Sequence, residues 1–487
     1  MKVLVSTAIG LCFAVASPAV AQSQASRFQT FLDQCHSAHV CNGVYLVARG
    51  DQVLFSGAVG DAGGEARSPL TIDTAFDIGS ISKQFTAMAV LRLVSEHRIS
   101  LDDRVSTYLA EFPYPDVTVA QLLSHTSGIP DILNEYGARL RSSGGLTLTG
   151  ADIVQVLAEA RHPAVAAPGD AYQYNNTGYL VLADLVEKTS GKPFEVYLDQ
   201  TFFQPLHMRN TWLRQPHERR EAMPRAEGFR PRADGSRQPF DQIPGLYLRG
   251  AGGLYSTVGD LMIWETALNG GRVVPAEFLA AATAPAPLND GSHAPYGFGL
   301  SLKPGSDGAR RISHGGHWRA FKSDLSYFPQ DRITIIQLTN NAEDESVDAN
   351  VTSLRALAQG RDAPPTRALI VYDLQARLDE SPAVIRQWFE MALHERPERY
   401  EFRESELNAL GYALLNRQEA EKAELVFELG TLAFPTSSNM FDSLADAREA
   451  QGDLQGTLAA AQAAWKNDPN SQALETRVLM LLRRLSH

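Results

Sequence analysis

The sequence predicts an α+β fold, in which an antiparallel sheet flanked by helices carries an inserted all-helical lobe, followed by an all-α helical repeat domain. Three observations lead to this prediction. Strand-like runs occur near the start of the chain and again before residue 340, while helical patterns dominate between them. Strands at both ends of such a stretch indicate one sheet assembled from both ends. After Gly360 the pattern becomes wholly helical, and it repeats.

The strands are expected where β-branched and aromatic residues lie between turn residues. Arg49-Gly50-Asp51 is expected to join the first two strands as a hairpin, and Pro329-Gln330-Asp331-Arg332 is expected to join the last two. The expected strands are Gly43–Ala48, Val53–Ala58, Gly297–Leu302, Arg311–Ser313, Ser323–Phe328 and Ile333–Thr339.

The length of 487 residues exceeds one ordinary core, so the chain is expected to form more than one domain. The first is expected over residues 28–358 and the second over residues 368–487, with a proline-containing linker at 359–367. In the second, Leu407–Pro435 and Phe441–Pro469 superimpose with a shift of 34 residues. This period resembles that of tetratricopeptide repeats, which are stacked helix pairs and would offer a surface to a protein partner. A plain helical bundle is the alternative.

Composition excludes several classes of function. The formal net charge of −12 and the absence of a basic run argue against nucleic acid as a partner. Hydrophobic residues make up 44% of the chain and charged residues 21%, which is typical of a globular protein. No phosphate-binding or dinucleotide-binding glycine motif is found, so no cofactor is expected.

The first residues have the pattern of a secretory signal. Lys2 precedes an apolar run over Val3–Val15, and Ala19-Val20-Ala21 fits a small-residue cleavage site. We therefore expect a signal peptide over residues 1–21 and a periplasmic or secreted mature protein. The apolar run is shorter than a membrane-spanning helix needs, and no later segment reaches that length, so no membrane span is expected.

Two cysteines follow this segment, Cys35 and Cys41. In an oxidising compartment they are expected to form a local disulfide, with a free pair as the alternative. His36 and His39 between them suggest a metal site, but four ligands within seven residues surround a tetrahedral ion poorly. No metal is expected.

The first stretch that indicates chemistry is Ser80-Ile81-Ser82-Lys83. An apolar run with helical spacing follows it, and residues i and i+3 lie on one face of a helix, so Ser80 and Lys83 can meet. A nearby amine can activate a neutral hydroxyl as a nucleophile. The alternative is an ordinary helix start with a solvated lysine.

A second motif is Tyr174-Asn175-Asn176, whose phenol and second amide leave the same side of an extended backbone. A phenol close to a lysine ammonium ionises more easily and can act as a base, and an amide can hold an acyl substrate by hydrogen bonds. The alternative is a turn tyrosine with a helix-capping asparagine.

A third motif, His314-Gly315-Gly316-His317, closes an expected strand. Its glycines allow close approach of substrate or backbone, and an edge strand there can offer an N–H to an oxyanion. The two histidines would point to opposite faces of the strand, which argues against a shared metal ion. A further polar segment, Ser124–Asp131, is interpreted as a scaffold loop in which His125 is structural.

Together these motifs resemble, in order and spacing, those of the class C β-lactamase family, over residues 28–358. That family includes penicillin-binding DD-peptidases, D-aminopeptidases and esterases, and its fold matches the expected sheet and helical lobe. The resemblance implies that Ser80 is the acylated nucleophile, that Lys83 takes or relays its proton, and that Tyr174 assists as a general base. It further implies that Asn176 orients the substrate and that the N–H groups of Ser80 and His317 bind the oxyanion.

The third motif departs from the Lys-Thr-Gly usual in β-lactamases of this class. His314 is mostly neutral at pH 7, and Gly315 supplies no hydroxyl, so recognition of an acidic β-lactam is weakened. We therefore expect an esterase or D-amino-acid peptidase with weak β-lactamase activity, acting on a small-molecule or peptide substrate. The chain has no Gly-x-Ser-x-Gly motif, which argues against an α/β-hydrolase. The alternative is a catalytically idle protein that binds peptidoglycan fragments and recruits a partner through its repeats.

Overall fold

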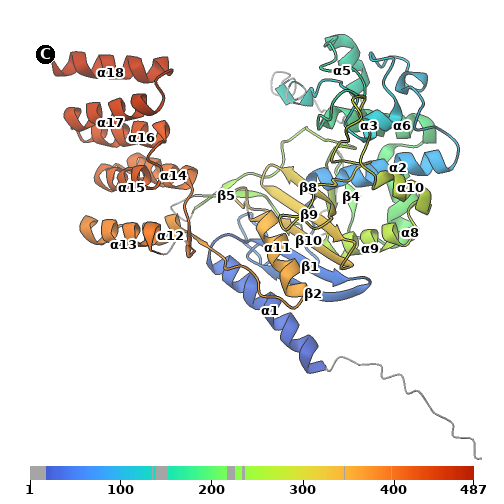
Figure 1. The fold of residues 1–487 in the computed structure, drawn as a ribbon, viewed down its shortest axis with the longest axis horizontal. Helices are drawn as coiled ribbons and strands as arrows, with labels where there is room; N and C mark the ends of the chain where they lie inside the picture. Colours follow the sequence, from blue (N-terminus) through green and yellow to red (C-terminus); the bar gives the residue numbers. More distant parts are fainter. Residues whose placement is uncertain are drawn as a thin grey trace, which may run out of the picture.

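The computed structural model describes residues 18–133, 135, 137–138, 152–215, 225–232, 236–344, 346–395 and 398–486. It confirms the predicted fold class: an antiparallel sheet with flanking helices and a helical lobe, followed by an all-helical array (Figure 1). The predicted signal peptide lies outside the described residues except for its last four, which begin helix α1 (Pro18–Ser37). Among the described residues, no helix is both long and apolar enough to cross a membrane.

Strands from both ends of the first 340 residues form the main sheet. Its order is β2-β1-β10-β9-β8, and every neighbouring pair is antiparallel. Pairing of Gly43 with Thr339 joins the early hairpin to the late strands. The strand bounds are β1 Gly43–Arg49, β2 Gln52–Val59, β8 Ile312–Trp318, β9 Phe321–Phe328 and β10 Ile333–Thr339. The strand that carries the histidine–glycine motif, β8, therefore lies at one edge of the sheet.

Two of the expected late strands differ in the structure. The segment 297–302 is not a strand and forms only isolated bridges, such as that between Ser301 and Ser313. Gly299 there has a φ of +72° and packs against α2 (Ser82–Ser95), where a Cβ would lie 2.7 Å from the carbonyl oxygen of Lys83. By contrast, β8 does not stop at Ser313 but continues through the whole motif to Trp318, because its glycines are compatible with extended backbone.

The alternation of side chains along β1 gives the sheet two apolar faces. Val44, Leu46 and Ala48 pack into the core shared with α2 and the other lobe helices, while Tyr45 and Val47 pack into a second core. Helices α1 and α11 (Val347–Ala358) cover this second face (Figure 1). The sheet is therefore the middle layer of three, with its helical lobe on one side.

Helices of the lobe lie on the first face, around α2, which is almost entirely buried. The longest of its neighbours in the lobe is α6, which packs directly against α2 and starts at Asn176. Further α-helices in the described part of this stretch are α3 Val119–Leu123, α5 Ile153–Ala160, α7 Phe194–Leu198, α8 Gln204–Leu206, α9 Val258–Asn269 and α10 Ala276–Ala282. Short strands β3 Phe76–Asp77, β7 Leu254–Ser256 and β4 Trp212–Leu213 form a second sheet beside them, and β5 Phe229–Pro231 pairs with β6 Arg237–Pro239.

The helical array repeats with the spacing that the sequence shows. Helices α14, α16 and α18 start 34 residues apart, as do α15 and α17. A Cβ at Gly411 would lie 2.3 Å from the Phe427 ring. Glycine at this position therefore allows α14 and α15 to pack closely. The helix bounds are α12 Ile370–Arg377, α13 Pro382–His394, α14 Glu404–Asn416, α15 Ala420–Ala433, α16 Ser438–Ala450, α17 Leu454–Asn467 and α18 Gln472–Leu485. The assignment to the tetratricopeptide class stays a prediction.

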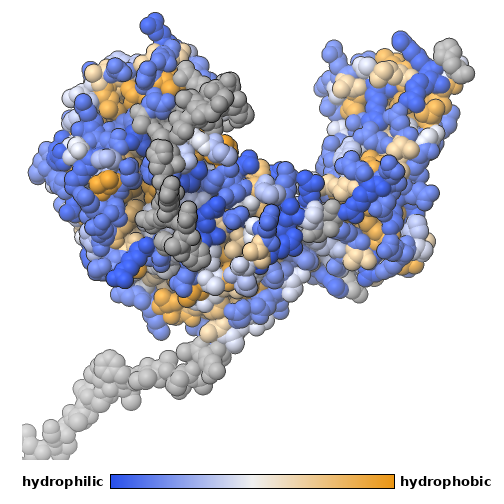
Figure 2. Space-filling view, turned by 180° about the vertical axis from the view of Figure 1, so that it is seen from behind, coloured by the Kyte–Doolittle hydropathy of each residue, from blue (hydrophilic) through white to orange (hydrophobic). Residues whose placement is uncertain are grey.

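The base of this array is attached to the sheet domain. The Leu369 N–H donates to the carbonyl of Ala38, and the His39 ring stacks on Tyr372 with 4.2 Å between ring centroids. Cys35 and Cys41 are joined by a disulfide in the same region, which answers the question that the sequence left open. From this base the array and the sheet domain rise on either side of a deep hollow (Figure 2).

Candidate active site

Ser80 occupies a tight turn between a short strand and a long helix. Strand β3 ends at Asp77, a 3₁₀ turn spans Gly79–Ile81, and α2 follows directly. Gly79 has a φ of +51°, and a Cβ on it would lie 2.9 Å from the amide nitrogen of His317. Only glycine fits this position without strain, so the turn and strand β8 are in close contact beside a partly exposed Ser80.

Lys83 lies one helical turn after Ser80 and is completely buried. Its Nζ lies 3.1 Å from Ser80 Oγ, 2.9 Å from Asn176 Oδ1 and 2.8 Å from the carbonyl oxygen of Ala251. Burial lowers its pKa to about 7, although the nearby carboxylate of Asp131 opposes this shift. Close to neutral pH, a large fraction of Lys83 is therefore an uncharged amine.

The three neighbours of this amine define which way its lone pair points. A neutral amine has two hydrogens and one lone pair. The carbonyl oxygens of Asn176 and Ala251 can only accept, so they take the two hydrogens. In the ammonium form Lys83 donates to Ser80 Oγ across the 3.1 Å contact, whereas in the neutral form the lone pair faces Ser80 and the Ser80 O–H donates instead. This arrangement prepares Lys83 to remove the proton of Ser80.

Tyr174 approaches the same hydroxyl from the loop before α6. It is hydrogen-bonded to Ser80, and its ring centroid lies 4.9 Å from Lys83 Nζ. Although 40% of the residue surface is exposed, the phenol end points into the site, and burial raises its pKa well above the usual value. The expectation of an easily ionised phenol is therefore wrong, because burial disfavours the phenolate by more than the hydrogen bond with Ser80 favours it. Tyr174 is suited to donate a proton rather than to hold a negative charge.

A buried histidine supports this tyrosine. His125 Nδ1 accepts the N–H of Asn175 at 3.1 Å, and its ring lies 4.3 Å from that of Tyr174. Burial and the nearby charge of Lys83 keep the pKa of His125 well below its ordinary value, so the ring is neutral. His125 lines neither of the two pockets that contain Ser80, which agrees with its interpretation as a structural residue.

Asn176 is held from both ends of its amide. Its Oδ1 accepts from Lys83, and its Nδ2 donates to Asp131 at 3.0 Å. Asp131 also accepts the Asn176 N–H, while the helix cap is the preceding residue, Asn175, which accepts from Gly178. In the sequence, Asp131 was placed in the scaffold loop Ser124–Asp131 and given no role at the site. Its position directly after the turn sequence Gly128-Ile129-Pro130 is one where an Asp side chain often bonds to nearby backbone N–H groups.

His314 does not offer a free ring nitrogen to a substrate. Its Nδ1 lies 2.7 Å from the carbonyl oxygen of Gly315, so this nitrogen carries the proton, and its Nε2 accepts from the Tyr296 hydroxyl at 2.8 Å. Burial and Lys83 lower its pKa to about 3. Neutral His314 lines the second pocket and is held by Tyr296, a residue that the sequence did not mark, and a role of His314 in binding substrate stays a prediction.

The two glycines of the motif have different surroundings. A Cβ on Gly316 would lie 2.1 Å from the carbonyl oxygen of Ile78, so this glycine allows β8 to contact the Ser80 turn. The Gly315 position is open, with its nearest neighbour at 3.7 Å. Ser323 on β9 donates to the same Ile78 carbonyl at 2.8 Å. These contacts bring the His317 amide beside the turn that carries Ser80.

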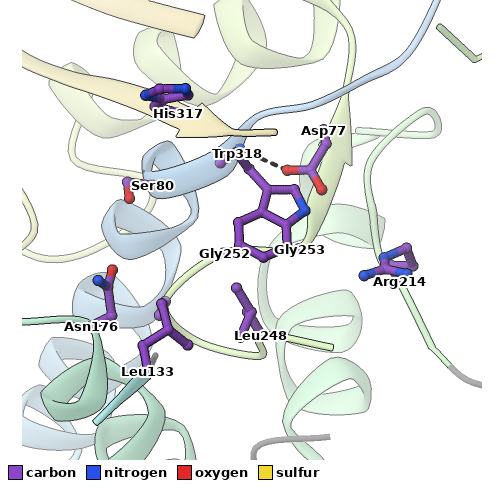
Figure 3. A pocket seen from close by; sticks show the side chains of 12 residues that line it. Asp77, Ser80, Leu133, Asn176, Arg214, Leu248, Gly252, Gly253, His317 and Trp318 are labelled. Atoms are coloured by element: carbon purple, nitrogen blue, oxygen red, sulfur yellow. Dashed lines mark hydrogen bonds between the residues drawn. The ribbon is translucent and has the colours of Figure 1, made fainter. Parts of the chain in front are cut away.

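Two pockets meet at the nucleophile. Ser80, Asn176 and His317 line both of them. The first pocket is completed mainly by Leu133, Leu248, Trp318, Asp77 and Arg214, and Figure 3 shows the Trp318 indole between Ser80 and Asp77. The second is completed by Tyr172, Tyr174, Tyr296, His314 and the basic residues Lys303, Arg311 and Lys322. A group bound to Ser80 can therefore extend in two directions.

Known proteins are similar to this chain in sequence and in fold. The family model described as Beta-lactamase matches residues 27–359. Penicillin-binding protein 4* of Bacillus subtilis (strain 168) is 28% identical over 66% of this chain and 73% of its own length. Esterase EstB of Burkholderia gladioli is 32% identical over 50% of this chain and 69% of its own. A D-aminopeptidase of Brucella anthropi is 28% identical, and the match spans little more than half of that protein, 56%.

Solved structures of other proteins have a similar fold. The octameric penicillin-binding protein homologue from Pyrococcus abyssi superimposes with a TM-score of 0.59 and 26% identity, covering 72% of this chain and 81% of that one. The family match ends at residue 359, so it leaves out helices α12 to α18. Over residues 27–359 the chain belongs to the Beta-lactamase family of serine hydrolases.

Proposed function

We propose that the protein is an exported serine hydrolase that forms an acyl-enzyme on Ser80 and cleaves an ester or amide bond, as an esterase or D-amino-acid peptidase. The observation that carries the proposal is that the buried Lys83 Nζ lies within hydrogen-bond distance of Ser80 Oγ and of two oxygen acceptors, Asn176 Oδ1 and the Ala251 carbonyl. A solvated lysine at a helix start, the alternative interpretation of the motif, would be charged and mobile.

Acylation follows from this geometry. Lys83 takes the Ser80 proton as Ser80 Oγ attacks the substrate carbonyl carbon, and the electron pair of the C=O bond moves to oxygen. The N–H groups of Ser80 and His317 are the proposed donors to that oxyanion. As the carbonyl re-forms, the bond to the leaving group breaks, and Tyr174 gives its proton to the leaving oxygen or nitrogen. The Lys83 ammonium then returns a proton to Tyr174, so both groups regain their starting state.

Deacylation repeats the same steps with water. A water molecule in the place of the leaving group loses its proton to Lys83, either directly or by a relay. In the relay, Tyr174 passes its own proton to Lys83 and takes the proton of the water. Its oxygen attacks the ester carbon, and Ser80 leaves as the alcohol with its proton restored. Because Tyr174 lines only the second pocket, the leaving group and the water are assigned to that pocket and the acyl group to the first.

Several features favour an ester or D-amino-acid substrate over a β-lactam. His314 is neutral with both ring nitrogens engaged, so it cannot replace the lysine that binds the acid group of a β-lactam in class C enzymes. The names of two relatives, a D-aminopeptidase and an esterase, support this preference. We propose that β-lactamase activity is weak.

The proposal is tested by covalent labelling. A fluorophosphonate probe is expected to label the purified protein once per chain, and Ser80→Ala should abolish labelling. Ser301→Ala is the matched control, since Ser301 lines the second pocket but, unlike Ser80, is not hydrogen-bonded to Lys83, and it should label like the wild type. Labelling that survives Ser80→Ala would reject the proposal. No turnover of any ester, amide or β-lactam by a labelled protein would favour the idle binding protein.

Export is proposed on two grounds: the N-terminal charge and apolar pattern, and the Cys35–Cys41 disulfide, which is typical of proteins outside the cytoplasm. Expression with the native N-terminus is expected to yield periplasmic protein that starts at Gln22, as read by intact mass. Retention of Met1 in the cytoplasmic fraction would contradict it.

For the helices beyond residue 367 we propose a tetratricopeptide-like array that binds a protein partner. The 34-residue spacing of helices α14 to α18 and the close packing at Gly411 support it. A pull-down with Glu406, Ala409 and Asn416, which line a pocket beside α14, changed together should lose partners that the wild-type chain retains. Identical sets of captured proteins would contradict the proposal.

A further inference from the structure

A chain of hydrogen bonds runs behind the Ser80 turn and ends on β8. Asp77 accepts the Gly79 N–H with one carboxylate oxygen, at 2.8 Å, and accepts from Gln242 Nε2 with the other, at 3.0 Å. Gln242 Oε1 in turn accepts from Trp318 Nε1 at 2.7 Å. The remaining hydrogen of Gln242 Nε2 is directed to the Tyr255 hydroxyl at 2.9 Å. Every donor and the acceptor of this side-chain amide therefore has a partner.

The chemistry of the partners fixes the orientation of the Gln242 amide. An indole N–H can only donate, so its partner must be the oxygen of the amide. A carboxylate such as that of Asp77 accepts, so its partner is the amide nitrogen. Asp77 is almost completely buried, and an unpaired polar group there would be costly, so the bonds are held in place by their surroundings.

The two ends of this chain lie next to the two proposed oxyanion donors. Gly79 precedes Ser80, and Trp318 follows His317. At the contact itself, the turn and β8 are so close that a Cβ on Gly79 would lie 2.9 Å from the His317 nitrogen. A second tie, from Ser323 Oγ to the Ile78 carbonyl, holds the turn to β9. Because β8 is an edge strand, the chain through Gln242 adds a tie on the side of β8 that is not paired with β9, beside the bond from Arg319 Nε to the Asp241 carbonyl oxygen.

We propose that Gln242 is a positioning residue, which sets the distance between the Ser80 and His317 amides through Asp77 on one side and Trp318 on the other. It also fixes the Trp318 indole as a wall of the first pocket (Figure 3). The inference rests on the proposed function, because it assigns a role in stabilising the tetrahedral state formed on Ser80. Displacement of such donors by about 1 Å typically lowers a rate by about 100-fold.

The test compares three single variants with p-nitrophenyl acetate as substrate and phenylboronic acid as inhibitor, since boron bound to a serine oxygen becomes a tetrahedral anion. Gln242→Leu removes all three bonds at similar size, and Trp318→Phe removes the indole N–H together with part of the ring. Gln238→Leu is the matched control, because Gln238 lies nearby in the chain, on β6, and its side-chain oxygen accepts from Arg232 at an exposed position. Circular dichroism melting identifies folded variants.

Gln242→Leu is expected to lower kcat by about 10- to 100-fold with KM nearly unchanged, and to weaken phenylboronic acid binding by a similar factor. Trp318→Phe should have a smaller effect of the same kind, and the double variant should lose less than the product of the two, because both changes break one chain of bonds. If Gln242→Leu does not fold, Trp318→Phe alone decides the matter.

Folded variants with wild-type kcat and wild-type inhibitor affinity would overturn the inference. So would a rise in KM alone, because Trp318 would then act only as a pocket wall. The wild-type enzyme separates this result from failure of the proposed function: if it is not acylated on Ser80, the mechanism is wrong, whereas acylation with unaffected variants rejects only the role of Gln242.

Discussion

Lys83 acts as a base in this account because of where its amine is buried. In water the ammonium form would dominate at neutral pH. In the site, burial lowers its pKa to about 7, and two carbonyl oxygens take its hydrogens. The nearby Tyr174 and His314 have pKa values displaced in the directions that keep both neutral. Lys83 can therefore gain and lose a proton near physiological pH, while Tyr174 and His314 stay neutral there.

This assignment predicts the pH dependence of the reaction. The pKa of Lys83 is lowered, and the amine must be unprotonated to accept the Ser80 proton, so kcat/KM should fall about tenfold per unit as the pH drops below about 7. Steady-state kinetics from pH 5 to 9 would show it. Lys83→Arg, which stays protonated, should lose at least about 100-fold at every pH. A profile that is level down to pH 5 would exclude Lys83 as the base.

Tyr174 is predicted to act as the acid for the leaving group. Its pKa is raised, so the phenol keeps its proton until the leaving group needs it. Tyr174→Phe should therefore slow a methyl ester, which has a poor leaving group, by about 100-fold or more, but a p-nitrophenyl ester of the same acyl group far less. Comparing kcat/KM for the two esters measures the difference. Equal losses would show that Tyr174 has another role.

At the scale of elements, the site depends on the fit between strand β8 and the turn that leads into α2. The fit is possible because Gly79 and Gly316 leave space for each other's backbone. Ser80 and Lys83 then belong to the start of one helix, while Tyr174 and Asn176 come from the loop and first turn of α6. Three separate elements meet, and each is anchored in the core under the sheet.

The two glycines of the motif give a matched pair of variants. Gly316→Ala places a methyl group 2.1 Å from the Ile78 carbonyl oxygen, so the strand must move away from the turn. We expect a loss of activity of about 100-fold or more and a lower melting temperature. Gly315→Ala faces open space and should fold and melt like the wild type. Equal stability and activity of both variants would contradict the close fit.

The same elements show what the sequence could and could not predict. Ser80, Lys83, Tyr174 and Asn176 were found because short spacing along a helix or an extended loop keeps such residues on one side. Asp131, Tyr296 and Gln242 were missed because they reach the site through contacts between segments that are far apart in the chain. The segment around Gly299 resembled a strand, but its packing on α2 required a positive φ that a strand does not have.

At the scale of the whole molecule, the sheet domain and the helical array share a core. Apolar side chains of α1 and the second sheet face are continuous with those of α12 to α14. The His39–Tyr372 stack and the bond from Arg403 to the Glu343 carbonyl lie at this junction. The array is therefore held at its base, while its far end extends from the sheet domain (Figure 1).

Because the core is continuous, heating is expected to unfold the sheet domain and the base of the array in one cooperative transition. Differential scanning calorimetry of the full chain should show a single main peak. Tyr372→Ala removes the stacked ring at the junction, and it should lower the melting temperature or split the peak. Two well-separated transitions in the wild type would contradict the shared core.

The central claim is that the hydroxyl of Ser80 becomes acylated with the help of Lys83 and Tyr174. The most direct measurement is to mix the Tyr174→Phe variant, in which turnover is slowed, with p-nitrophenyl acetate, quench with acid, and locate the adduct by peptide mass mapping. One acetyl group is predicted, on the peptide that contains Ser80. No acetyl group is predicted in the double variant that carries both Tyr174→Phe and Ser80→Ala. An acetyl group on another residue, or p-nitrophenol release that continues in the Ser80→Ala protein, would contradict it.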